Sequence, residues 1–301
     1  MTGVRTVADG FAAYSAWAND PVPRIPFGLP FFDGPTGGGI ARAESAMIMS
    51  YSSVGKTTIG LNIVRNNPLI PTIVFSLEMS WRLMVPRLAA MDYGISTQAM
   101  EQEVKASRGF NPYAQGVTDK YRWLVCDDTS AIDLRQAAES YKRAAEILGT
   151  PPRLIIWDYL ELIGGSGLMT KTEAVDRAAQ RLRDFHKDRD ASGIVMHQVG
   201  KTSGTGGYEP LSLDSGRYGG HQPMDYVVGA YAPRLNPELT EFEYLQHQPE
   251  LYLQLLKNRN GSAAPVGVKH RQDPVSMRVT PWTEPQLTTG YTPRFSYGEE
   301  H

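Results

Sequence analysis

The segment from Ser50 to Thr57, which reads Ser-Tyr-Ser-Ser-Val-Gly-Lys-Thr, constrains the fold of this chain more than any other. It follows an apolar run at residues 46–49 and precedes a stretch at residues 56–65 with helical composition. The segment fits the phosphate-loop pattern G-x-x-x-x-G-K-S/T except at its first position, where Ser50 replaces glycine. Because such a loop joins a buried strand to a helix N-terminus, the pattern predicts an α/β fold with a mostly parallel sheet.

A phosphate loop needs a turn whose backbone N–H groups converge on phosphate oxygens, a lysine that reaches the β- and γ-phosphates, and a hydroxyl for Mg²⁺. Gly55, Lys56 and Thr57 supply these parts. Ser50 is small, so we expect it to weaken nucleotide binding at most. The alternative is an ordinary strand-turn-helix connection without a ligand. The predicted nucleotide contacts in the loop are Ser50, Ser53, Val54, Gly55, Lys56, Thr57 and Thr58.

Short apolar runs alternate with longer segments of helical composition over most of the chain, as in parallel sheets with crossover helices on both faces. Strands are predicted at residues 46–49, 72–77, 122–125, 154–157, 194–197 and 226–231, and helices at 56–65, 80–93, 131–148 and 173–190. Pro86 is expected to kink the second helix or to remove its first turns. Three short strands at 251–256, 266–269 and 277–280 predict a C-terminal antiparallel β extension.

Three parts of the chain differ in character. Residues 1–24 combine a short amphipathic helix at residues 7–17 with a Pro-rich linker, residues 25–283 form the predicted ATPase-like domain, and residues 284–301 are a Pro/Thr/Tyr-rich tail. The N-terminal helix either packs on its own domain or docks onto a neighbouring subunit, and the pattern leaves both interpretations open.

Composition excludes several classes of protein. The 301 residues are 41% hydrophobic and 21% charged, which is ordinary for a globular chain, and no apolar run approaches the roughly 20 residues that cross a bilayer. Because the N-terminus has no signal-peptide pattern, we expect a cytoplasmic protein without a membrane partner. The single cysteine, Cys126, is predicted to be a core strand residue. A net charge of −2 implies that any polyanion site is local.

Polar residues follow three of the predicted strands at the edge where ligands bind in open parallel sheets. Asp158 fits a Mg²⁺-associated carboxylate, although an isolated strand-end acid is more often a helix cap. Glu78 fits a carboxylate that orients the attacking water, or alternatively an acid in a helix first turn. Gln198 fits a sensor of the γ-phosphate, whereas His197 should face the opposite way and pack in the core.

Two cations close a later strand. Strand alternation aims Lys257 and Arg259 in the same direction. They either satisfy a carboxylate of their own chain or reach a γ-phosphate bound to the adjacent subunit, in the manner of an arginine finger.

These motifs, taken in order, resemble the RecA-like motor domain of DnaB-type replicative helicases over about residues 25–282. Besides the phosphate loop, the resemblance rests on residues 27–33 (Phe-Gly-Leu-Pro-Phe-Phe-Asp), 36–39 (Thr-Gly-Gly-Gly), 75–80 (Phe-Ser-Leu-Glu-Met-Ser), 127–129 (Asp-Asp-Thr), 156–162 (Ile-Trp-Asp-Tyr-Leu-Glu-Leu) and 257–261 (Lys-Asn-Arg-Asn-Gly). It implies a RecA-like P-loop fold and a ring-shaped homo-oligomer, usually a hexamer, in the cytoplasm of a bacterial or phage-infected cell. It also implies that ATP and Mg²⁺ bind between subunits and that single-stranded DNA occupies the central channel.

The resemblance assigns roles to residues that match the family motifs. Lys56 and Thr57 would bind phosphate and Mg²⁺, Glu78 would be the catalytic carboxylate and Asp158 the Walker-B acid. Gln198 would couple hydrolysis to movement, Arg87 would contact the base, and Lys257 with Arg259 would act in trans.

The region of the family's DNA loops departs from the usual pattern, because residues 201–208 and 215–221 are glycine-rich and lack its Arg-Glu-Ser-Gly sequence. They still suit a nucleic acid, since glycines bring backbone N–H groups near phosphates and aromatic rings stack on bases. The alternative is a surface loop without a ligand. The predicted DNA contacts are Lys201, Arg217, Tyr218, Gly219 and His221.

The sequence is compatible with three functions. The first is an ATP-dependent DNA helicase or translocase. The second is a RecA-family DNA-dependent ATPase of recombination or DNA processing without unwinding, with a nuclease role if Asp127, Asp128 and Asp158 share a metal. The alternative for Asp127 and Asp128 is that they are structural caps. The third, a small-molecule phosphotransferase, has no use for paired cations that act in trans.

Overall fold

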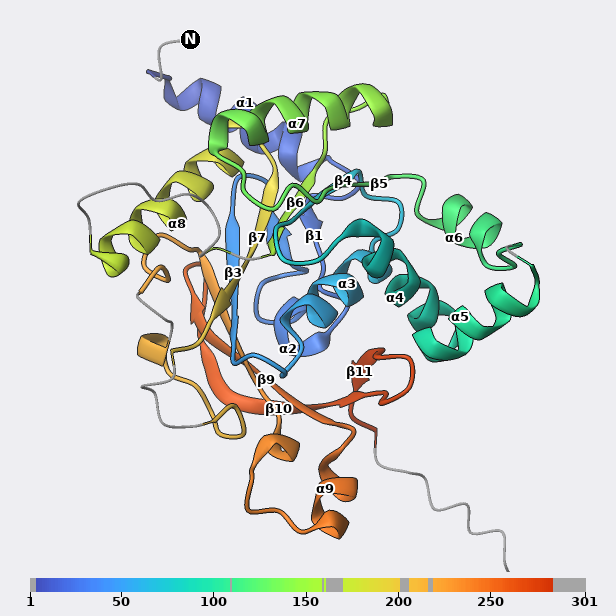
Figure 1. Ribbon diagram of the computed structural model, residues 1–301. Coiled ribbons are helices and arrows are strands. Elements are labelled where there is room, and N and C mark those ends of the chain that lie inside the picture. Colours follow the sequence, from blue (N-terminus) through green and yellow to red (C-terminus); the bar gives the residue numbers. More distant parts are fainter. Residues whose placement is uncertain are drawn as a thin grey trace, which may run out of the picture.

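The computed structural model describes residues 4–108, 110–158, 160, 170–200, 206–215 and 219–283, and a nine-stranded sheet forms the centre of this part of the chain. The nine strands have the order β11-β10-β9-β8-β3-β7-β6-β4-β5 (Figure 1). The parallel strands are β3 (Ser45–Ser50), β4 (Thr72–Ser76), β5 (Leu124–Asp127), β6 (Leu154–Asp158), β7 (Ser192–Gln198) and β8 (Tyr226–Tyr231). The antiparallel strands are β9 (Glu250–Asn258), β10 (Ala264–Gln272) and β11 (Val279–Pro281). The predicted parallel sheet with an antiparallel extension is confirmed.

Helices cover both faces of the parallel part (Figure 1). On one face α3 (Lys56–Asn66) and α4 (Trp81–Tyr93) pack on Ala46 and Ile48 of β3, and on the other face α7 (Leu134–Leu148) and α8 (Lys171–Asp188) pack on Met47 and Met49. Alternate side chains of one strand therefore enter two separate cores. This explains why the buried parallel strands read as continuous apolar runs in the sequence.

Several boundaries differ from the prediction for local reasons. Strand β5 begins at Leu124, two residues late, because Leu124 closes a turn by donating its N–H to the carbonyl of Tyr121. Helix α7 begins at Leu134 because the side chain of Asp133 caps its first turn. Strand β11 begins at Val279 because Met277 has a φ of +64°, which no strand residue adopts.

Of the two outcomes predicted for Pro86, the loss of the first turns does not occur. Helix α4 keeps its first turns and runs from Trp81 to Tyr93 with Pro86 inside it. A proline in the second turn withholds a hydrogen bond from the carbonyl of Arg82, and Arg82 is exposed, so water can replace that bond.

Further short elements complete the chain without having been predicted. They are β1 (Arg24–Ile25), α2 (Pro30–Asp33), β2 (Ile40–Ala41), α5 (Thr97–Ala106), α6 (Ala114–Lys120), η3 (Leu213–Ser215), η4 (Pro233–Leu235) and α9 (Glu241–His247). Strands β1 and β2 pair with each other in a separate two-stranded sheet.

The N-terminal helix forms as predicted. Helix α1 spans Val7–Ala18, is capped by Thr6 and Asp9, and has no buried residue; Phe11 is 68% exposed. The predicted tail at residues 284–301 lies outside the described residues.

Cys126 lies in the edge strand β5 and is half-buried, and burial raises the pKa of its thiol to about 12. Within the described ranges, no helix combines the length and apolar character that a membrane span requires.

Candidate functional site

A cavity of about 710 Å³ opens at the carboxyl edge of the parallel strands, around the start of α3. Its size suits a nucleotide-sized ligand. Its lining residues come from the phosphate loop, from the loop after β4 and the first turns of α4, from the end of β7 and from the β10–β11 turn. They are Ser52, Ser53, Gly55, Lys56, Thr57, Thr58, Glu78, Met79, Ser80, Leu83, Arg87, Gln198 and Met277.

Most of the residues predicted to contact nucleotide line this cavity, but Ser50 and Val54 do not. Both side chains are fully buried: Ser50 ends β3, and Val54 packs in the core beneath the loop. Ser52, Met79, Ser80, Leu83 and Met277 line the cavity without having been predicted. Nothing in the sequence marks Met277, since it reaches the cavity only because the β10–β11 turn folds back over α3, where Asn62 donates to its carbonyl at 3.2 Å.

The loop backbone explains which glycine is required. Gly55 has a φ of +112° and precedes α3 as its N-cap, a conformation that strains any residue with a side chain. The other left-handed position, with a φ of +74°, belongs to Ser53. Ser50 instead lies in a strand that pairs with both β7 and β8. Serine therefore replaces the first glycine of the motif without backbone strain.

Thr57 lines the cavity and contacts Asp158, which is buried behind it. The hydroxyl of Thr57 donates to Asp158 Oδ2 at 2.6 Å, and Asp158 is only 2% exposed. Burial raises the pKa of Asp158, and the bond from Thr57 opposes that rise. The second oxygen, Oδ1, is buried and has no hydrogen-bond partner among the described residues. A hydroxyl and an unsatisfied carboxylate oxygen side by side fit hydrated Mg²⁺.

Glu78 and Gln198 line the cavity, as expected for residues at the carboxyl ends of parallel strands; β4 and β7 flank β6 in the sheet. Glu78 comes two residues after β4 ends and is exposed to the cavity. Gln198 ends β7 and donates to the hydroxyl of Ser52 in the phosphate loop at 2.8 Å. His197 is completely buried, as predicted. Arg87 reaches the same cavity from α4.

Lys257 and Arg259 lie near the amino ends of the parallel strands, opposite the carboxyl ends where the phosphate loop lies. Strand β9 runs antiparallel to β8, and Lys257 pairs with Val227 near the start of β8. The six-residue strand β3 separates this end of the sheet from the phosphate loop by roughly 17–20 Å. Lys257 donates to the carbonyl of Gln222 at 2.7 Å, and Arg259 pairs with Asp225 at 2.7 Å. Neither cation reaches the cavity of its own chain.

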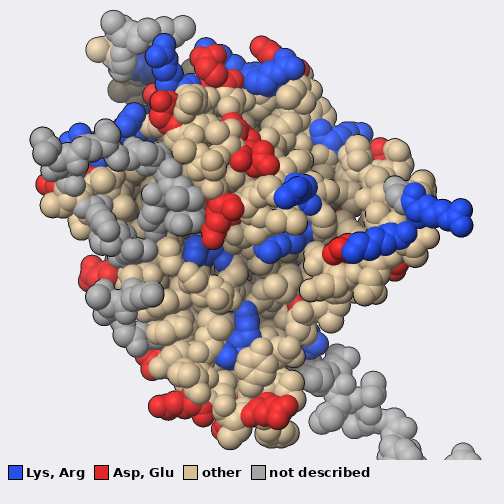
Figure 2. Space-filling model, viewed as in Figure 1, with Lys and Arg blue, Asp and Glu red and all other residues tan. Residues whose placement is uncertain are grey.

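Of the predicted DNA contacts, Lys201, Arg217 and Tyr218 lie outside the described residues. Gly219 has a φ of +86°, and burial lowers the pKa of the His221 imidazole. Both lie away from the nucleotide cavity. On the face shown in Figure 2, Lys and Arg are scattered among Asp and Glu, in keeping with the small net charge.

The shared-metal arrangement considered for a nuclease is contradicted. Asp127 accepts hydrogen bonds from Thr129 N–H at 3.0 Å and from the Ser140 hydroxyl, and Asp128 accepts from Trp81 N–H at 2.9 Å at the start of α4. Asp128 therefore caps the start of α4, and Asp127 holds the turn after β5 against α7. Within the part of the chain that the structure describes, no three His, Cys, Asp or Glu residues cluster as metal ligands would.

Similar structures support the fold. An ATPase domain superposes with a TM-score of 0.75 at 16% identity, covering 93% of this chain and 100% of that one. A DnaB-like replicative helicase, solved to study its interactions with primase, superposes with a TM-score of 0.70 at 17% identity, covering 94% and 68%.

Curated relatives are more similar in sequence. The replicative DNA helicase DnaB of Treponema pallidum is 26% identical over 251 residues, which is 81% of this chain and 52% of the relative. The replicative DNA helicase DnaB of Synechocystis sp. is 27% identical over 169 residues, which is 54% of this chain and 19% of the relative. The chain thus spans at most about half the length of these two relatives.

The family described as "DnaB-like helicase C terminal domain" matches this chain over residues 25–277, which include the phosphate loop, Asp158 and the Lys257–Arg259 turn. The chain belongs to this family, which implies a nucleotide-binding site.

Proposed function

We propose that this protein is an ATP-dependent DNA helicase or translocase that works as a ring-shaped homo-oligomer, a hexamer by resemblance to its family. One observation carries the proposal. The phosphate loop lies at the carboxyl ends of the parallel strands, and Arg259 lies near their amino ends. A chain that needs both for hydrolysis must borrow the cation from a neighbour. A head-to-tail contact that closes on itself makes such a ring.

The cavity supplies the parts that phosphoryl transfer needs. Lys56 would pair with the β- and γ-phosphates, while Thr57 and Asp158 would hold Mg²⁺, which neutralises charge on these oxygens when bound. Glu78 would orient and deprotonate the attacking water from the exposed wall. Gln198, which contacts the phosphate loop through Ser52, would sense the γ-phosphate.

The exposed helix α1 supports assembly into a ring. Its apolar side chains Val7, Phe11 and Tyr14 are 78%, 68% and 61% exposed. A helix whose apolar side chains stay in water gains stability by docking on another surface. We propose that this surface belongs to the neighbouring copy.

DNA binding is proposed on the position of two loops, residues 201–208 and 215–221, and on the activity that the names of the curated relatives state. Both segments follow β7 in the sequence, and the last residue of β7 is the proposed sensor Gln198. A shift of Gln198 on hydrolysis would thus pass directly into the DNA loops.

The decisive experiment measures ATP turnover with and without single-stranded DNA, together with native mass by light scattering. We expect an oligomer whose turnover rises with DNA and is abolished by Lys56→Ala. The control is Lys142→Ala, which removes an exposed lysine from α7. Full turnover by a monomer, or by Lys56→Ala, would refute the proposal. Strand displacement on a forked duplex then distinguishes unwinding from DNA-dependent hydrolysis alone.

A further inference from the structure

Asp225 holds Arg259 through both its main chain and its side chain. The backbone N–H of Arg259 donates to the carbonyl of Asp225 at 2.9 Å, and Arg259 Nη1 donates to Asp225 Oδ1 at 2.7 Å. One residue therefore fixes both where the side chain starts and where the guanidinium ends.

Asp225 is itself fixed by the body of the domain. Its other oxygen accepts the backbone N–H of Ser45, the first residue of the central strand β3, at 2.9 Å. Arg183 of α8 approaches Oδ1 at 3.3 Å, and the Asp225 side chain is only 5% exposed. A buried carboxylate with partners on a strand and a helix cannot follow movements of a surface turn, so it is a rigid anchor.

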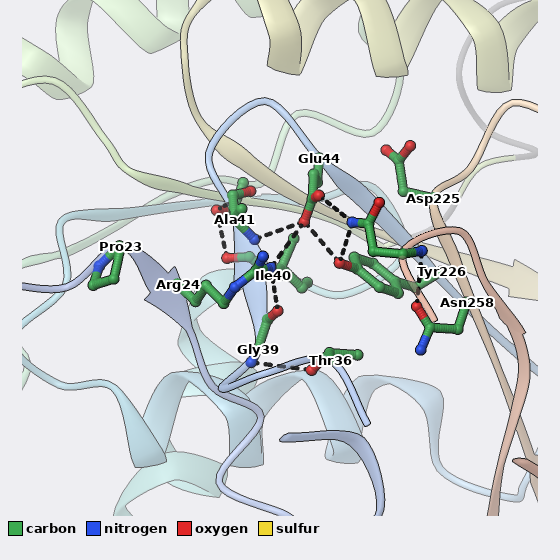
Figure 3. A network of polar contacts seen from close by, with 12 residues as sticks. Pro23, Arg24, Thr36, Gly39, Ile40, Ala41, Glu44, Asp225, Tyr226 and Asn258 are labelled. Atoms are coloured by element: carbon green, nitrogen blue, oxygen red, sulfur yellow. Dashed lines mark hydrogen bonds and ion pairs between the residues drawn. The ribbon is translucent and has the colours of Figure 1, made fainter. Parts of the chain in front are cut away.

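The turn that carries Arg259 is pinned beside this anchor. Asn260 donates to Glu44 at 2.6 Å and to the hydroxyl of Tyr226 at 3.0 Å. Glu44 also accepts from Tyr226 at 2.8 Å and from the N–H of Ala41 at 2.9 Å; Figure 3 shows this network with Asp225 next to Tyr226. The side chain of the residue that follows Arg259 is thus held in place.

The side chain of Arg259 is partly exposed to solvent. Its exposed fraction is 45%, and its guanidinium donates to Asp225 through a single nitrogen. Guanidinium groups carry five N–H donors in a planar fork, so one edge can bind a carboxylate while the others bind phosphate. Asp225 and a phosphate can therefore hold the same guanidinium together.

We propose that Asp225 is a positioning residue that aims Arg259 at the nucleotide bound to the neighbouring subunit. This inference rests on the proposed function. Functional groups act only when surrounding contacts hold them near the productive geometry, and a misplacement of about 1 Å can cost about 100-fold in rate.

The first test compares Asp225→Asn, Arg259→Ala and the double variant, all as full chains. Asparagine keeps the shape and can still accept from Ser45 but removes the charge that holds Arg259. We expect kcat for ATP to fall about 10- to 100-fold in Asp225→Asn with KM little changed. The double variant should be no slower than Arg259→Ala, because both changes act through the same guanidinium. The control is Asp92→Asn, another carboxylate with several partners, among them Arg65 and Lys120, which should keep its kcat.

The second test mixes subunits. Asp225→Asn has an intact phosphate loop and an Arg259 that is no longer held in place. Lys56→Ala has a defective phosphate loop and a correctly held Arg259. If Asp225 acts across the interface, equal mixing should raise turnover above the mean of the separate variants, because about one quarter of the interfaces then combine an intact loop with an aimed arginine. Arg259→Ala mixed with Lys56→Ala is the reference. If Asp225→Asn does not assemble, Asp225→Glu, which keeps the charge beside Arg183, replaces it in the mixture.

The outcomes separate the two proposals. Loss of turnover in Arg259→Ala without any loss in Asp225→Asn overturns the positioning role alone. Slow turnover of Asp225→Asn that mixing does not restore, while mixing restores Arg259→Ala, assigns Asp225 a role within its own subunit and also overturns it. Wild-type turnover of Arg259→Ala overturns the proposed function itself.

Discussion

The hydroxyl of Thr57 donates to Asp158 Oδ2 at 2.6 Å and so joins the first turn of α3 to the end of β6, although the two residues are 101 positions apart. The bond leaves Asp158 Oδ1 buried without a partner in the described chain. A buried, unsatisfied carboxylate oxygen costs free energy unless a ligand or water compensates it. The pair is therefore preorganised for a hydrated cation at the expense of the free protein's stability.

Asp158→Asn tests this preorganisation. The amide keeps the shape but loses the charge, so we expect Mg²⁺-dependent nucleotide binding or ATP turnover to fall about 10- to 100-fold. Asp127→Asn, another strand-end acid that lies outside the cavity, is the matched control and should retain both. Binding is followed by titration with a fluorescent ATP analogue at several Mg²⁺ concentrations. An unchanged Mg²⁺ dependence in Asp158→Asn would remove this residue from the metal site.

Substitutions at Ser50 and Gly55, the two positions where the phosphate-loop motif has glycine, should have different effects. Ser50→Gly should not tighten nucleotide binding, because Ser50 ends a strand, and it should lower stability by about 0.5–1 kcal/mol. Gly55→Ala should weaken binding at least about 10-fold, because a residue with a Cβ at a φ of +112° is strained by about 1–3 kcal/mol.

Nucleotide titration and thermal unfolding of both variants check this pair. Tighter binding by Ser50→Gly would show that the serine does restrain the loop, as the motif alone suggested. Normal binding by Gly55→Ala would contradict the loop geometry.

The sequence predicts the repeated strand-loop-helix units because buried parallel strands are uninterrupted apolar runs. It also predicts that Asp158, Glu78 and Gln198 meet at the phosphate loop, because parallel strands bring their carboxyl ends to one edge. It does not reveal α5 or α6, which are short and bury little; α5 buries only Met100. Helices of this length depend on tertiary contacts rather than on their own periodicity.

The sequence also does not predict contacts that depend on strand register. The pairing of Arg259 with Asp225 depends on how β9 aligns with β8, including a register shift between Val227 and Val228. No local pattern marks Asp225 as the partner. The sequence pattern leaves open whether Lys257 and Arg259 bind a carboxylate or a phosphate, and in the structure Arg259 binds the carboxylate of Asp225.

His186 predicts a pH-dependent stability. It is completely buried, accepts from Trp157 Nε1 at 2.8 Å and contacts the Ser45 hydroxyl at 2.8 Å, and burial lowers its pKa from 6.5 to about 3. Between pH 6.5 and about 3, His186 is protonated in the unfolded chain but neutral in the folded chain. The free energy of unfolding therefore falls as pH falls below 6.5. From pH 6.5 to 5 the loss should be about 1.5 kcal/mol.

Urea unfolding of the wild type and of His186→Gln over this pH range isolates the effect, since all other titrating groups are shared. The variant is expected to start less stable but to lose less stability on acidification. Equal pH slopes for the two proteins would mean that His186 is protonated in the folded state.

Helix α1 gives the last prediction, because its apolar face is exposed in the single chain. Phe11→Asp should weaken each subunit contact by about 1.5–3 kcal/mol, the free energy of burying a phenylalanine, and should leave protomer unfolding unchanged. Native mass should then shift to smaller species, and ATP turnover per chain should fall with it, because Arg259 must come from a neighbour. Phe242→Asp is the matched control, since Phe242 is 70% exposed on α9. If Phe11→Asp keeps both the mass and the turnover of the wild type while protomer stability falls, α1 packs on its own domain and the first of the two interpretations of its pattern holds.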